Sequence, residues 1–151
     1  MAMVQVIVVV VLAVVGVGVA AVLRRRGIDD PDQGPSYAVP SQLDRADFTR
    51  PDAPWLVAVF SSATCLACQG TWEKARVLES GEVAVQELEA VSDLEIHQRY
   101  GVDSVPLVLV ADGEGVVRRH FLGPPTATDL WAALAELREP GTVPPSCTHD
   151  D

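Results

Sequence analysis

Residues 60–68 of the chain read FSSATCLAC and place two cysteines, Cys65 and Cys68, two residues apart. The apolar run before them, residues 55–60, has the length of a buried strand, and residues 69–79 after them have the pattern of a helix. The first thiol is therefore predicted at a helix N-terminus, where unpaired backbone N–H groups and the helix dipole favour a thiolate over a thiol. This spacing at a strand-to-helix turn indicates a redox-active pair.

Length, charge and cysteine content limit what the chain can be. Its 151 residues are enough for one domain with an appendage. With 11 basic and 21 acidic residues its formal charge is −10, and because phosphate binding needs a basic face we expect no nucleic-acid partner. Three cysteines are too few for a secreted fold held by disulfides. The third, Cys147, is interpreted as an incidental free thiol, with pairing to Cys65 or to another chain as the alternative.

The N-terminal part of the chain is apolar over the 20 residues from Val4 to Leu23, with Gln5 as its one strongly polar side chain. As a helix this run would reach about 30 Å, the thickness of the hydrocarbon core of a bilayer, so residues 1–23 are predicted to be one transmembrane helix. The basic cluster from Arg24 to Arg26 follows the run, whereas a cleaved signal carries its charge in front. The same cluster predicts a single-pass protein of the cell membrane with a cytoplasmic soluble domain.

Composition divides the remainder into three parts. Residues 24–41 are rich in Gly, Pro and Asp and are predicted to be a flexible linker. Residues 42–138 carry the periodic apolar pattern of a folded domain, and residues 139–151 are a polar tail that we expect to be disordered.

Strand-like and helix-like stretches alternate through the domain. Residues 83–88 have the pattern of a strand, residues 105–110 are a further apolar strand, and residues 116–122 are its predicted hairpin partner after the turn at 112–115. Two helix starts have the form of a capping box, Ser92-x-x-Glu95 and Thr126-x-x-Asp129. The order β-α-β-α-β-β-α predicts an α/β fold, a small mixed sheet with helices on both faces, because a β-α-β start implies a parallel crossover and the closing hairpin adds an antiparallel edge.

Helical spacing also predicts which side chains face the core. In the last helix the expected core positions are Leu130, Leu134 and Leu137. In the helix after the cysteines the apolar residues form a broad arc that we expect to be buried: Leu66, Ala67, Gly70, Ala75, Val77 and Leu78.

Residues 43–137 resemble the thioredoxin fold family, and four features carry the resemblance in the family's order. They are the strand Val57-Ala58-Val59-Phe60 leading into Cys65-Leu66-Ala67-Cys68, Tyr100-Gly101-Val102 followed by Val105-Pro106, a strand and turn ending at Gly113, and Gly123 before the final helix. Together with the apolar run at the N-terminus, the resemblance predicts a membrane-anchored thioredoxin-domain protein. It also implies that the Val105–Pro106 bond is cis and lies against the cysteine pair, where these two residues would bind an extended substrate chain.

The sequence departs from the thioredoxin pattern around the pair. Thr64 stands where Trp is usual, Val59 where an Asp is often buried, and Leu107 where Thr commonly follows the cis-proline. The proline that commonly kinks the active-site helix is replaced around Glu73, and the dipeptide between the cysteines is Leu66-Ala67. The resemblance therefore supplies neither the redox potential of the pair nor the proton acceptor of its second cysteine.

The predicted function is that of a membrane-tethered thiol–disulfide oxidoreductase acting in cell redox homeostasis. Cys65 is the predicted nucleophile and Cys68 the resolving cysteine, and together they form the redox-active disulfide. Expected partners are protein thiols and disulfides and an unidentified electron donor or acceptor, with no cofactor. The alternative is a redox-sensing thioredoxin-like module that binds a membrane partner.

Four other polar residues are candidates for a part in the reaction. Glu87 and Glu89 follow the middle strand and are interpreted as a solvated strand end in preference to a proton relay. His97 and His120 are expected to lie at the surface or partly packed, without a catalytic role.

A metal site is the competing interpretation of the cysteines. Cys65, Cys68, Cys147 and His149 offer four potential ligands. That interpretation gives no role to Pro106 or to the strand–turn–helix context, so no metal is expected.

Overall fold

The structure, a computed structural model, describes Gln5 and residues 38–141. The predicted membrane anchor, the linker up to residue 37 and the end of the tail with Cys147 lie outside the described residues. Within the part that is described, no helix is both long and apolar enough to cross a bilayer.

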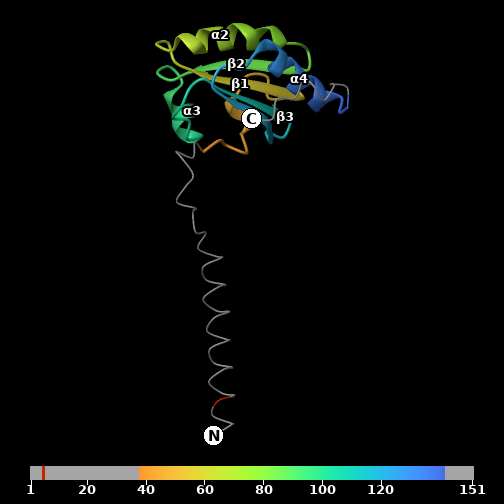
Figure 1. The fold of residues 1–151 in the computed structure, drawn as a ribbon, viewed down its shortest axis with the longest axis horizontal. Coiled ribbons are helices and arrows are strands. Elements are labelled where there is room, and N and C mark those ends of the chain that lie inside the picture. The colour runs from red at the N-terminus through yellow and green to blue at the C-terminus, as the bar shows by residue number, and fades with distance from the viewer. Residues whose placement is uncertain (1–4, 6–37, 142–151) are drawn as a thin grey trace. The chain divides into compact units, whose positions relative to one another are not determined.

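Four strands form one mixed sheet in the order β2-β1-β3-β4 (Figure 1). The central strand β1 (Trp55–Ser61) runs parallel to β2 (Val83–Glu89) and antiparallel to β3 (Leu107–Asp112), which pairs in turn with β4 (Val117–Leu122). The apolar run in β1 is continuous because both faces of this strand are covered. The predicted element order and the mixed sheet are confirmed.

Helices cover both faces of the sheet, as predicted (Figure 1). On one face lie α2 (Leu66–Ala75), continued by the short helix η2 (Arg76–Leu78), and the C-terminal α4 (Ala127–Arg138). On the other lie α3 (Leu94–Arg99) and the N-terminal segment with the short helix η1 (Arg45–Asp47).

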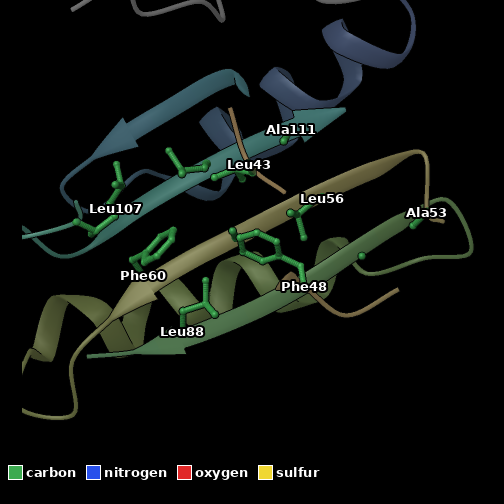
Figure 2. Close-up of a cluster of buried hydrophobic side chains, with 12 residues drawn as sticks. Leu43, Phe48, Ala53, Leu56, Phe60, Leu88, Leu107 and Ala111 are labelled. Carbon is green, nitrogen blue, oxygen red and sulfur yellow. The ribbon is translucent and has the colours of Figure 1, made fainter. Parts of the chain in front are cut away.

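Strand alternation divides the core into two clusters. Val57 and Val59 point to the face of α2 and α4, where Leu130 and Leu134 pack against them. The intervening side chains point to the opposite face. There Phe60 lies between its register partners, Leu88 of β2 and Leu107 of β3 (Figure 2).

The predicted buried arc of the helix after the cysteines is wrong in part. Leu66 is 84% exposed and Val77 is 55% exposed. The buried positions instead follow one helical stripe: Cys68, Thr71, Ala75 and Leu78. The phase of the helix is set by its start at Cys65, and the hydroxyl of the buried Thr71 donates to the carbonyl of Ala67 at 2.9 Å, so a polar side chain is accommodated in this stripe.

The two predicted capping boxes have different outcomes. At α4 the Thr126 hydroxyl accepts from the N–H of Asp129, whose carboxylate accepts from the N–H of Thr126, so this box is confirmed. At α3 the box predicted at Ser92 does not form. The N-cap residue is Asp93, and its carboxylate accepts from the N–H of Glu89 at the end of β2 instead of capping the helix.

Candidate active site

The two cysteines lie at the junction of β1 and α2 and are joined by a disulfide, with a Cα–Cα distance of 5.3 Å. Cys65 is the N-cap residue of α2 and has extended backbone dihedrals, φ −99° and ψ 105°. Its Sγ accepts a hydrogen bond from the backbone N–H of Cys68 at 3.2 Å. The first sulfur therefore occupies the position at which a helix stabilises negative charge, and the first turn of α2 carries no acidic residue to oppose it.

The two sulfurs differ in access. Cys68 is 1% exposed and belongs to the buried stripe of α2, whereas Cys65 is partly exposed. The residue that follows Cys65, Leu66, points into solvent. A protein disulfide that approaches the end of α2 thus reaches Cys65 and not Cys68.

The Val105–Pro106 peptide bond is cis, as the resemblance implied. Leu107, the first residue of β3, pairs in register with Phe60, so Pro106 lies at the end of the sheet where the chain leaves β1 for the cysteines. The carbonyl of Pro106 accepts from the N–H of Gly123 at 2.9 Å. Direct contact between Pro106 and the cysteine pair stays a prediction.

Glu89 fastens the loop that carries the cysteines, a role the sequence interpretation missed. One carboxylate oxygen accepts from the N–H of Ala63 at 3.1 Å, and the other accepts from the N–H groups of Val91 and Ser92 at 2.9 and 3.0 Å. The N–H of Ser92, followed by those of Ala63 and Val91, holds the pKa of Glu89 below its usual value. Glu89 is therefore not a solvated strand end: it joins the segment before Cys65 to the turn between β2 and α3.

Glu87 is also not the solvated residue that was predicted. Its Oε1 accepts from the Oγ of Ser61 at 2.8 Å, Ser61 is 1% exposed, and Glu87 itself is half-buried. Both side chains are on the sheet face that α2 covers. Val59 belongs to the core cluster on that face, Ser61 follows it by two residues in β1, and Glu87 is its register partner in β2.

His97 is buried, contrary to the prediction. It is 5% exposed, and its Nε2 is 2.9 Å from the carbonyl oxygen of Leu88. Its ring packs edge-on against that of Phe60, with the ring centroids 5.0 Å apart. This packing belongs to the sheet face opposite the one that Cys68 faces, so His97 is a core residue and not part of the site. His120 on β4 is exposed, as predicted.

The structure brings together no group of three or more His, Cys, Asp or Glu side chains suited to a metal ion within the residues it describes. Two members of the alternative metal set, Cys147 and His149, lie outside those residues.

A mixed four-stranded sheet with helices on both faces, a Cys-x-x-Cys disulfide at the start of α2 and a cis-proline before β3 define a thioredoxin-like fold. No protein-family model and no curated protein matches the chain.

Solved structures of thioredoxins share this fold with the chain. A single-residue mutant of thioredoxin from Halobacterium salinarum superposes with a TM-score of 0.53 at 21% identity, covering 62% of this chain and 81% of that chain. The germline-specific thioredoxin Deadhead from Drosophila melanogaster gives 0.50 at 21% identity, covering 58% and 84%. Fasciola hepatica thioredoxin gives 0.50 at 20% identity, covering 57% and 83%.

Proposed function

We propose that the domain is a thiol–disulfide oxidoreductase that exchanges disulfides through Cys65 and Cys68. The observation that carries the proposal is the asymmetry of the pair. Cys65 is accessible and is the N-cap residue of α2, whereas Cys68 is buried one turn further along the helix. Accessibility and thiolate character are what a nucleophilic cysteine requires, and a buried neighbour within disulfide distance is what a resolving cysteine requires.

The reaction proceeds in two exchanges. The Cys65 thiolate attacks one sulfur of a substrate disulfide, which forms a mixed disulfide and releases the first substrate thiol. Cys68 then attacks the Sγ of Cys65, which re-forms the Cys65–Cys68 disulfide and releases the second thiol. Two electrons pass from the protein dithiol to the substrate, and the reverse sequence oxidises a substrate dithiol.

Val105 and Pro106 are proposed to bind the substrate chain. They precede β3 at the end of the sheet from which the cysteine loop departs, as the pairing of Leu107 with Phe60 indicates. The backbone of Val105 can hydrogen-bond an extended substrate segment there, which would align its disulfide with Cys65.

The proposal extends to a tethered protein. The run from Val4 to Leu23 supports a membrane anchor by its length and composition, and the Arg24–Arg26 cluster supports a cytoplasmic domain. A flexible linker would raise the effective concentration of the domain for membrane-bound thiols and disulfides. The electron donor or acceptor of the domain would then be a redox partner in the same compartment.

A trapping experiment tests the exchange function. In the full chain, Cys68→Ser removes the resolving thiol, so mixed disulfides through Cys65 should accumulate and be released by reductant. The matched control is Cys65→Ser/Cys68→Ser, which should trap nothing. Recovery of the same partner by the double variant would contradict catalysis and support the redox-sensing binding module instead.

A further inference from the structure

We infer that Glu87, held by Ser61, accepts the proton of Cys68 when this cysteine attacks the mixed disulfide. The inference rests on the proposed exchange function and adds to it a catalytic residue.

Cys68 needs a proton acceptor that solvent does not supply. A thiol attacks a disulfide only as the thiolate, and burial in apolar surroundings disfavours that charged form. Cys68 is 1% exposed and lies in the stripe of α2 that packs on the sheet. The acceptor must therefore come from the sheet face beneath α2.

Strand alternation places Glu87 on that face. Along β2, Val83 and Val85 point into the cluster under α2 and α4, and Glu87 is the next residue of the same parity. Along β1, Val59 and then Ser61 continue the same face toward the cysteine loop. Figure 1 shows α2 lying over β1 and β2.

Ser61 orients the carboxylate and leaves one oxygen available. Its Oγ donates to Oε1 of Glu87 at 2.8 Å from a buried position. Among the residues that the structure describes, none donates a hydrogen bond to Oε2 of Glu87. A half-buried carboxylate with one fixed and one free oxygen is arranged to take up a proton.

The other charged groups on this side of the sheet are already engaged or distant. Glu89 accepts three backbone N–H groups with its two oxygens. The ammonium of Lys74 on α2 donates a hydrogen bond to the backbone carbonyl of Pro125, ahead of α4. Asp112 lies at the opposite end of β3 and is ion-paired, and Arg119 is on the edge strand β4. Glu87 is left as the acceptor.

In the resolving step, the proton of the Cys68 thiol moves to Oε2 of Glu87, and the Cys68 sulfur bonds to Sγ of Cys65. The bond between Cys65 and the substrate sulfur breaks, and its electron pair leaves on that sulfur, which is protonated by Glu87 or by water. The protein dithiol is oxidised to the disulfide and the substrate disulfide is reduced to two thiols.

A stopped-flow measurement tests this step in the full chain with Cys147→Ser as background. The reduced protein is mixed with the aromatic disulfide 5,5′-dithiobis(2-nitrobenzoate). A first release of thionitrobenzoate, which depends on reagent concentration, reports the attack by Cys65. A second, independent of concentration, reports the attack by Cys68. Glu87→Gln should slow the second release about 100-fold at pH 7, make its rate rise with hydroxide concentration, and leave the first release unchanged.

Two further variants complete the test. Glu95→Gln removes the same charge from an exposed site on α3 and should alter neither release. Ser61→Ala keeps the carboxylate but not its orientation and should slow the second release by about 10-fold. It carries the test should Glu87→Gln fail to fold. An unaltered second release in either variant overturns the role of Glu87, whereas absence of the first release in the parent overturns the exchange function itself.

Discussion

Cys65 and Cys68 have the same side chain, and their positions in α2 give them different chemistry. At the N-cap, Cys65 is accessible and receives a backbone N–H from the first turn. Three residues later, Cys68 is buried against the sheet. In the proposed exchange the helix terminus favours the thiolate of Cys65, whereas the buried Cys68 requires a base. This difference is the reason for the role proposed for Glu87.

A pH dependence of stability is predicted from Glu89. Its pKa is lowered from 4.5 by the backbone N–H groups of Ser92, Ala63 and Val91, so the folded state binds this proton more weakly than the unfolded state. The stabilisation is present above the unfolded pKa and is lost as the pH falls through the folded pKa. Urea unfolding should show a difference in the free energy of unfolding between parent and Glu89→Gln at pH 7, and this difference should begin to narrow as the pH falls below about 4.5 and close at lower pH.

The control for Glu89 is Glu95→Gln, which removes an exposed carboxylate from α3. We expect no pH-dependent gap for it. A gap between parent and Glu89→Gln that stayed constant from pH 7 to pH 3 would show that the carboxylate charge does not hold the cysteine loop.

The helix α2 was only partly predictable from the sequence. Its existence and its start at the cysteines followed from the strand-to-helix pattern. Its buried face did not, because a small polar residue, Thr71, satisfies its own hydroxyl inside the stripe while Leu66 points into solvent. Hydrophobicity alone assigns these two residues to the wrong sides.

Two leucines of this helical segment test the corrected face. Leu78→Ala should lower the free energy of unfolding by about 2–5 kcal/mol, because it leaves a cavity in the core under η2. Leu66→Ala should change it by less than about 0.5 kcal/mol, since this side chain is exposed. Chemical denaturation of both variants measures the difference. Equal losses would contradict the assigned helix phase.

The same limit applies to the strands. The apolar runs and turn residues were sufficient to predict β1, β2, β3 and β4 in order, because the central strands β1 and β3 are nearly continuous apolar segments and a turn separates β3 from β4. The hydrogen-bond partners of Glu87 and Glu89 were not predictable, since they depend on the register of β2 against β1 and on the chain returning past Ala63. Such contacts between distant segments leave no pattern in one sequence.

At the scale of the whole molecule, the order of elements indicated a mixed α/β sheet, and the resemblance supplied the cis bond before β3. The described part of the chain has that architecture. The membrane anchor remains a prediction from residues 1–23.

Orientation in the membrane is tested by a reporter. An enzyme that is active only in the cytoplasm, fused after Asp151, should give a signal in intact cells because the Arg24–Arg26 cluster favours a cytoplasmic C-terminal side. A reporter active only outside the cytoplasm is the control and should be silent. The opposite pair of results would refute this orientation and assign the domain to an oxidising compartment.

Disulfide exchange by Cys65 and Cys68 is measured by the rate at which the full chain reduces the interchain disulfides of insulin in the presence of dithiothreitol. We expect the parent to accelerate the reduction well above the rate with dithiothreitol alone, and Cys65→Ser to return it to that rate. Acceleration that survives in Cys65→Ser, or a parent no faster than dithiothreitol alone, would show that the pair does not exchange disulfides as proposed.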